Sequence, residues 1–320
     1  MKNDGKSSIW LNGMMGLVVA DALGVPVEFM SREELRRNPV TDMRGFGTYN
    51  LPAGSWSDDS SMALATLHSL QNGYDLKNMM EKFVQWMTYG EYTPFGELFD
   101  IGNTCRIAIF KYAMNGDVAR CGGYGERDNG NGSLMRILPI CLYMYEKQKQ
   151  EDLLDEDVIS AVHEVSALTH GHLRSKIACG LYFFLVRSIL ENEGNLEIVL
   201  QKGLDAGFAY YETNPENAGE LAHYARLRHL DEFGHLSEDE IQSTGYVVAS
   251  LEAALWCLVN TENYKEATLK AVNLGSDTDT VAAIAGGLAG LYYGYEDIPE
   301  EWMKEVKRRE WVEGMCEVNT

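Results

Sequence analysis

Two short acidic motifs, one near each end of the chain, contain the residue types best suited to metal chemistry. The first, SDD, stands shortly before MALATLHSL, and the second, DTDT, stands before VAAIAGGLAG. Their oxygen donors are Ser57, Asp58, Asp59, Asp277, Asp279 and Thr280. Either motif alone is typical of a helix N-cap, because Ser and Asp accept hydrogen bonds from the free N–H groups of a first turn. Together they would form an all-oxygen site suited to Mg²⁺, Mn²⁺ or Ca²⁺ rather than zinc.

Four carboxylates at such a site are enough for two ions. Like charges at this spacing repel one another, and their burial is costly unless a partner neutralises them. The spacing alone does not show whether the two motifs meet in the fold.

A glycine-rich loop, NGNGS, offers a different chemistry. It consists of Asn129, Gly130, Asn131, Gly132 and Ser133 and leads into a predicted helix. Small residues let a ligand approach the backbone closely, and amides at a helix start suit a phosphate or ribose. The alternative is a simple turn capped by Ser133. No strand precedes the loop, so it is neither a Walker motif nor a dinucleotide fingerprint.

Three further side chains are candidates of lower specificity. Glu28 follows Pro26 just beyond the first predicted helix, and either faces a pocket or is a solvated loop acid. Asp100 precedes a predicted helix and is at least as typical of a cap as of a catalytic acid. His170, in THGH, is suited to donate to a phosphate but is also typical of a loop or cap.

The elements that must position these residues are predicted to be helices. Apolar residues recur at helical spacing, and runs of alternating β-branched residues are absent. The predicted helices cover roughly 8–23, 59–72, 76–89, 99–115, 132–145, 156–168, 173–192, 195–209, 216–227, 244–259, 262–275 and 279–294. Asp21 lies on the largely apolar first helix and needs a partner, whereas Gly13, Gly16 and Ala20 form a small face for close packing. With no low-complexity linker, one domain spanning residues 1–320 is the simplest interpretation.

Composition narrows the class of protein. The 320 residues are 45% hydrophobic and 23% charged, as in ordinary soluble proteins, and the net charge is −21. Such a charge argues against general nucleic-acid binding, but not against one nucleotide-like ligand in a local pocket. The six cysteines form no CxxC pair, which favours a reduced, cytoplasmic protein. Asn12 and Asp21 interrupt the N-terminal apolar stretch, so we expect a buried helix rather than a signal peptide or membrane span.

Taken in order, the motifs resemble those of the ADP-ribosylglycohydrolase family, which includes the dinitrogenase reductase-activating glycohydrolase and the vertebrate ADP-ribosylhydrolases. The chain has GMMGLVVADALGVPVE near its start, then SDDS, FDIGNT, GNGSLMR, TH and finally GSDTDT. Each motif is weak by itself, but the ordered set from Gly13 to Gly294 is specific. Ala20 stands where family members usually have glycine, and Ser57 where threonine is more usual; a serine oxygen can still bind a metal.

The resemblance implies an all-α, orthogonal multi-helix domain with a dinuclear divalent-metal cleft that binds ADP-ribose. It implies two ions, Mg²⁺ or Mn²⁺, held by the six oxygen donors of the acidic motifs. It further implies catalytic roles for Glu28, Asp59 and Asp100, and it places the NGNGS loop and His170 at the ribose and diphosphate.

The activity implied is hydrolysis of an N- or O-glycosidic bond at C1″, which releases ADP-ribose from an ADP-ribosylated protein or small molecule. Which carboxylate serves as base stays open at this point. Two alternatives remain: a non-catalytic ADP-ribose or nucleotide-binding protein, and a helical interaction protein whose acidic turns are only caps.

Overall fold

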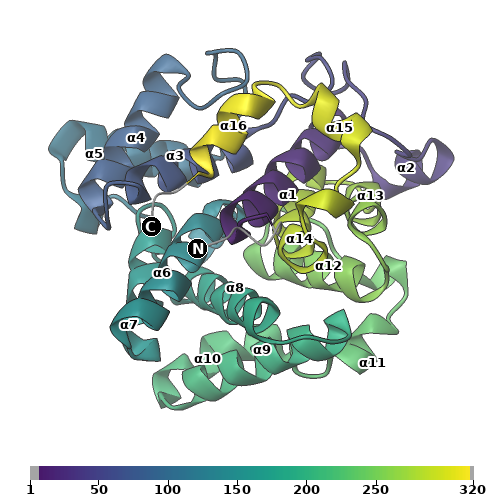
Figure 1. Cartoon of the computed structure of the whole chain (residues 1–320). Coiled ribbons are helices and arrows are strands. Elements are labelled where there is room, and N and C mark those ends of the chain that lie inside the picture. The colour runs from purple at the N-terminus through teal and green to yellow at the C-terminus, as the bar shows by residue number, and fades with distance from the viewer. Residues whose placement is uncertain (1–6, 318–320) are drawn as a thin grey trace.

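The computed structural model describes residues 7–317, and its regular structure is helical (Figure 1). Within that range there is no strand, only two isolated bridges, Gly123 with His170 and Gly130 with Tyr246. The all-α prediction is therefore confirmed. The α-helices are α1 Ile9–Gly24, α2 Arg32–Arg37, α3 Asp58–Leu70, α4 Leu76–Tyr89, α5 Asn103–Asn115, α6 Leu138–Glu151, α7 Asp155–Ala167, α8 Leu173–Glu191, α9 Leu196–Glu212, α10 Ala218–Leu221, α11 Leu230–Gly234, α12 Val247–Val259, α13 Tyr264–Asn273, α14 Thr278–Tyr293, α15 Glu300–Glu305 and α16 Arg309–Met315.

Helices α1 and α14 lie side by side at the centre of the fold, although they come from opposite ends of the chain (Figure 1). Both are buried along nearly their whole length. Glycines allow this close approach, because a Cβ added at Gly16 would lie only 2.4 Å from the carbonyl oxygen of Gly286. The small face predicted on the first helix is thus the contact with α14.

The segment Ile9–Val27 is long and apolar enough to cross a membrane by length and composition alone. Of its 18-residue window, 83% is buried inside the protein, as is usual for the core helix of a globular fold.

Several predicted boundaries were wrong for identifiable reasons. The helix predicted at 99–115 begins only at Asn103, because Gly102 has extended backbone angles and its N–H donates to the Asp58 side chain. The helix predicted at 132–145 is a short 3₁₀ turn, Leu134–Arg136, followed by α6. Pro139 lacks an N–H and is tolerated only in a first turn, so α6 cannot begin earlier. The region 216–227 consists of the short α10 between 3₁₀ turns.

The α1–α14 contact leads to a stability prediction. A Cβ at Gly286 would lie 2.4 Å from the Cβ of Ala20 and from the backbone oxygen of Gly16, so Gly286→Ala must push the two helices apart. We expect a loss of about 1–3 kcal/mol in the free energy of unfolding, measured by urea denaturation. Gly219→Ala in α10 is the control, because no atom lies within 4 Å of its added Cβ. Equal effects of the two substitutions would contradict the packing argument.

Candidate active site

The two acidic motifs meet where α3 and α14 begin. Thr280 Oγ1 donates to Asp59 Oδ2 at 3.3 Å, joining residues 221 positions apart in the sequence. Asp58, Asp277 and Thr280 line a cleft of about 350 Å³. Asp59 and Asp279 are only 1% exposed each. The structure therefore brings together the two motifs whose meeting the spacing left open.

Helix capping does not account for the carboxylates. Ser57 is the N-cap of α3 through its hydroxyl, but the side chain of Asp277, at the N-cap position of α14, makes no capping hydrogen bond to the backbone of that helix. Its carboxylate instead accepts from Asn131 Nδ2 at 2.7 Å. Asp59 Oδ1 is buried and has no hydrogen-bond partner among the described residues. A buried carboxylate oxygen without a donor is a good fit for a cation that the protein itself does not supply.

Asp21 finds its partner at the start of α3. Its carboxylate accepts from the N–H groups of Ser57 and Ser60 and from the Ser60 hydroxyl, at 2.5 to 3.1 Å. Asp21 is fully buried, and burial raises its pKa to about 6 despite these bonds. Because its oxygens are engaged by α3, Asp21 orients the SDD motif beneath the cleft.

The carboxylates are dense enough to hold more than one ion. One group comprises Asp21, Asp59 and Asp279, and a second comprises Glu28, Asp100 and Asp279; in each, one oxygen per residue lies within 4.8 Å of the others. Asp279 belongs to both groups and therefore stands between them. Oxygen donors in this number suit hard divalent cations.

Burial and mutual repulsion perturb these acids strongly. Burial raises the pKa of Asp58, Asp59 and Asp279 well above the ordinary value, and neighbouring carboxylates raise it further. Ionised acids in such a place require either protons or cations as counter-charges. The repulsion within this cluster can therefore be relieved by bound protons or by cations.

Glu28 faces the cleft from the turn after α1. It is 6% exposed, and Tyr49 Oη donates to its Oε2 at 2.5 Å. Burial, opposed in part by that hydrogen bond, raises the pKa of Glu28 to about 8, and Asp100 contributes as a like charge. Asp100 is half-buried in the same cleft, and burial raises its pKa as well.

The backbone beyond Glu28 is tied to the second acidic motif. Phe29 N–H donates to Ser276 O, and Ser276 N–H donates to Met30 O, both at 2.7 Å. Phe29 and Ser276 both adopt positive φ, 66° and 65°, where bulky residues are strained. Two strained positions joined by paired hydrogen bonds hold Glu28 at a fixed place beside Asp277.

The glycine-rich loop contributes two free backbone N–H groups and the Asn131 side chain to the cleft. Gly130, Asn131 and Gly132 line the cleft, and within residues 7–317 the N–H groups of Gly130 and Gly132 donate to no protein acceptor. Asn129 and Ser133 lie behind the loop: Asn129 bonds to Glu126 and Ser175, and Ser133 to Ser166. Of the five residues predicted to contact the ligand, Asn129 and Ser133 do not line the cleft, and their side chains bond within the protein instead.

His170 is held as a neutral imidazole beside the glycine loop. Arg136, which is fully buried, donates to Thr169 Oγ1 at 2.8 Å, and Thr169 Oγ1 lies 2.9 Å from His170 Nδ1. Donation from the Thr169 hydroxyl to Nδ1 would leave the ring hydrogen on Nε2. Burial, aided by the Arg136 charge, lowers the pKa of His170 to about 3. Nε2 lies beside the glycine loop, 3.4 Å from where a Cβ of Gly130 would stand.

Sequence reasoning missed Tyr49 and the pair Arg136 and Thr169 as contributors to the site. Tyr49 lies in the loop GFGTYNLPAG, whose glycines mark a turn but give no sign of a partner 21 residues away. Arg136 follows the glycine loop in sequence, yet only its complete burial shows that it supports His170.

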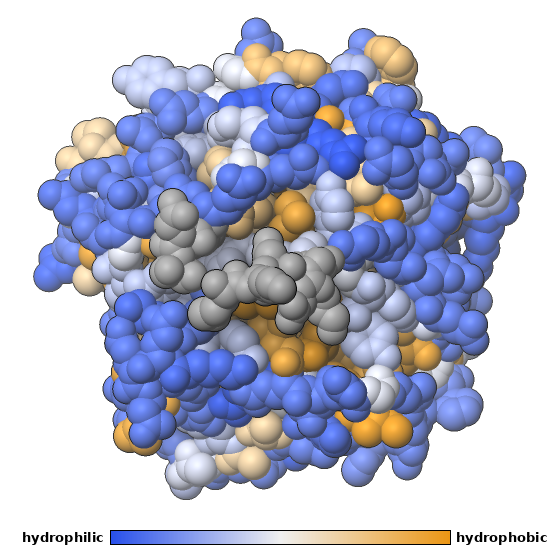
Figure 2. All heavy atoms as spheres, in the orientation of Figure 1, coloured by the Kyte–Doolittle hydropathy of each residue, from blue (hydrophilic) through white to orange (hydrophobic). Residues whose placement is uncertain are grey.

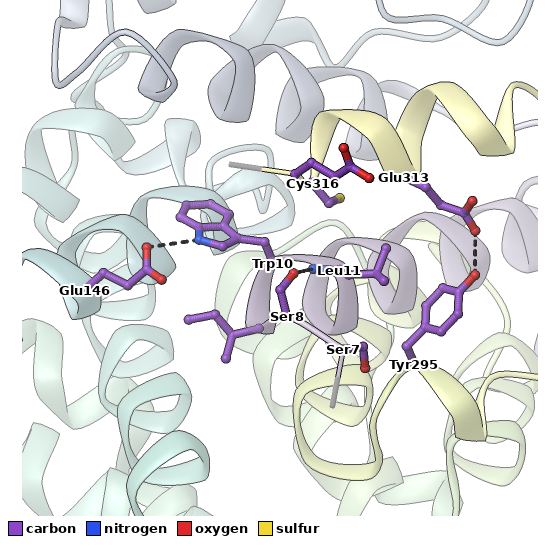
Figure 3. Close-up of a pocket in the computed structure, with 10 residues that line it drawn as sticks. Ser7, Ser8, Trp10, Leu11, Glu146, Tyr295, Glu313 and Cys316 are labelled. Carbon is purple, nitrogen blue, oxygen red and sulfur yellow. Dashed lines mark hydrogen bonds between the residues drawn. The ribbon is translucent and has the colours of Figure 1, made fainter. Parts of the chain in front are cut away.

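A larger cavity, of about 640 Å³, lies beside the described ends of the chain. On that face hydrophobic residues gather around a central hollow within a mostly hydrophilic surface (Figure 2). Figure 3 shows Trp10 bonded to Glu146 and Tyr295 bonded to Glu313 there. None of the potential metal-ligating groups found in residues 7–317 lies in this cavity.

Comparison with known proteins agrees with the geometry. The sequence profile described as ADP-ribosylglycohydrolase matches residues 7–319. The chain is 32% identical over 306 residues to the ADP-ribosylarginine hydrolase Tri1 of Serratia proteamaculans, covering 95% of this chain and 76% of that protein. It is 34% identical to the Tri1 protein of Pseudomonas putida, covering 92% and 72%, and 30% identical to the ADP-ribosyl-[dinitrogen reductase] glycohydrolase of Rhodospirillum rubrum, covering 92% and 89%.

A solved structure described as an ADP-ribosylglycohydrolase-related protein complex superposes with a TM-score of 0.75 at 32% identity, covering 96% of this chain and 95% of that one. Fold, motif order and whole-chain similarity agree, and the chain therefore belongs to the ADP-ribosylglycohydrolase family.

Proposed function

We propose that this protein is a divalent-metal-dependent hydrolase that removes ADP-ribose from ADP-ribosylated arginine by cleaving the glycosidic bond at C1″. The observation that carries the proposal is the meeting of the two acidic motifs at one cleft, which Asp58 and Asp277 line together with a glycine-rich loop. Arginine is the acceptor named for two relatives, each 32–34% identical over more than nine tenths of this chain.

Two Mg²⁺ or Mn²⁺ ions would be held by the carboxylates of Asp58, Asp59, Asp277 and Asp279, with hydroxyl oxygens from Ser57 and Thr280. The unpartnered Asp59 Oδ1 and the raised pKa values of the cluster support this assignment. Such ions, when bound, supply a water of lowered pKa and charge stabilisation.

The chain's own groups orient the substrate and move the proton. The free N–H groups of Gly130 and Gly132, with His170 Nε2–H, are donors matched to a diphosphate, and their neutral character avoids a competing charge beside the acids. Glu28 is assigned to proton transfer at the scissile bond, because it faces the cleft, Tyr49 holds one of its oxygens, and its raised pKa lets it carry a proton near neutral pH. Asp100 lies close enough to favour that protonated form.

Asp59→Asn tests the metal centre. We expect the metal-free variant to be at least as stable as the wild type, because the substitution removes a buried like charge. We expect it to lose both divalent-dependent ADP-ribose release and the increase in melting temperature on addition of Mg²⁺ or Mn²⁺. Asp205→Asn, an exposed acid on α9, is the matched control and should retain both. Wild-type responses in Asp59→Asn would remove the basis for the metal assignment.

The pH dependence of stability should have opposite signs with and without metal. Because the folded-state pKa values of these acids are raised, the folded protein binds more protons than the unfolded chain. Without metal, the free energy of unfolding should therefore fall as the pH rises from about 4.5 to about 8, the pKa of Glu28 in the folded protein. Metal competes with those protons, so the Mg²⁺-induced rise in melting temperature should grow over the same range. Thermal melts at several pH values measure both trends, and a pH-independent Mg²⁺ effect would contradict carboxylate ligation.

Glu28→Gln separates chemistry from binding. Loss of a positioned proton-transfer group should lower kcat by about 10²–10⁴-fold, while ADP-ribose should still raise the melting temperature. Asp100→Asn provides the comparison, with a smaller decrease in kcat expected. If Asp100→Asn were the more damaging substitution, the proton-transfer role would pass to Asp100. ADP-ribose binding without any turnover in the wild type would instead favour a non-catalytic ADP-ribose-binding protein.

A further inference from the structure

Three aromatic rings form a wall beside Glu28, and one of them, Phe29, lines the cleft. The ring of Tyr49 lies 6.5 Å from that of Phe29 and 5.0 Å from that of Phe99, centroid to centroid, with interplanar angles of 60° and 62°. Three separate segments of the chain supply these rings. We call Phe29, Tyr49 and Phe99 the aromatic wall.

The wall is flanked by acids of the active site. Glu28 is next to Phe29 in sequence and accepts a hydrogen bond from Tyr49, while Asp100 follows Phe99. Both acids and Phe29 line the cleft. A group lying against the wall would therefore contact aromatic carbon and carboxylate oxygen together.

Phe29 is held outward at a conformational cost. Its side chain is 70% exposed and its φ of 66° is one that a bulky residue rarely adopts. The paired hydrogen bonds with the Ser276 segment fix this conformation. An exposed ring maintained in a strained backbone beside a catalytic cleft points to a ligand contact rather than to packing.

The wall and the glycine loop contact different carboxylates of the site. Asp277 bonds to Asn131 of the glycine loop, whereas Glu28 bonds to Tyr49 of the wall. If the diphosphate binds the loop and the ribose binds the carboxylates, the Glu28 end of the cleft, next to the wall, is left for the substituent at C1″.

We propose that the aromatic wall recognises the guanidinium group of the ADP-ribosylated arginine. This inference rests on the proposed function and adds the residues that select the acceptor. A guanidinium is planar and cationic, so it stacks on aromatic faces and pairs with carboxylates. A serine acceptor has neither a plane nor a charge and gains nothing from the wall.

The test compares two small substrates, ADP-ribosylarginine and ADP-ribosylserine, with Phe29→Asn. Asparagine tolerates the left-handed backbone and removes the ring, so the fold and Glu28 should be preserved. We expect kcat/KM for the arginine substrate to fall about tenfold, mainly through KM, with kcat/KM for the serine substrate unchanged. The melting-temperature shift with ADP-ribose should also be unchanged, and Phe29→Tyr should retain wild-type discrimination.

Phe46→Asn is the matched control, because Phe46 is equally exposed, has a φ of 62°, and lies outside the residues that line the cleft. It should leave both substrates unaffected. Tyr49→Phe keeps the ring and removes the hydrogen bond to Glu28, so it should lower kcat for both substrates without changing their ratio.

The outcomes separate the two proposals. Equal losses for both substrates in Phe29→Asn, or no loss for either, would overturn the role of the wall. A wild-type enzyme that prefers the serine substrate would overturn it too, while leaving ADP-ribose hydrolysis intact. Release of ADP-ribose from neither substrate by the metal-loaded wild type would refute the hydrolase and, with it, the wall.

Discussion

The structure depends on the burial of several carboxylates of like charge at one point. Asp59 and Asp279 are almost inaccessible to solvent, and Glu28, Asp58 and Asp100 lie around them. Such a cluster stores unfavourable electrostatic free energy, which only protons or cations can relieve. The surrounding fold must therefore be rigid enough to keep the acids together.

That rigidity comes from the contact between α1 and α14. Glycines at the crossing let the two backbones approach more closely than larger side chains would allow, and α14 begins at the second acidic motif. Asp21, on α1, accepts hydrogen bonds from the start of α3. It therefore fixes the first acidic motif against α1. Arg32 adds a further link, since its guanidinium donates to the backbone oxygen of Leu274, just before the second acidic motif, and to that of Ile241.

The cleft combines three environments within a protein of net charge −21. Its lining includes carboxylates, the glycine loop with the neutral His170, and Phe29 next to Glu28. Neutral donors can hold a diphosphate without drawing the carboxylates into ion pairs, because His170 stays uncharged next to the buried Arg136. An acidic surface is therefore compatible with an anionic ligand when the recognition is local.

The sequence by itself determined the helical class, the family and the identity of most acids in the site. Helical periodicity is a local property, and motif order survives without coordinates, so both could be read from the chain. The tertiary structure decided what depends on long-range approach. It joined Asp59 to Thr280, gave Asp21 its partner, turned Asn129 and Ser133 away from the cleft, and placed Tyr49 on Glu28. These contacts join segments that only packing brings together, and burial, which sets their pKa values and hydrogen-bond partners, is a property of the folded chain rather than of any short stretch of it.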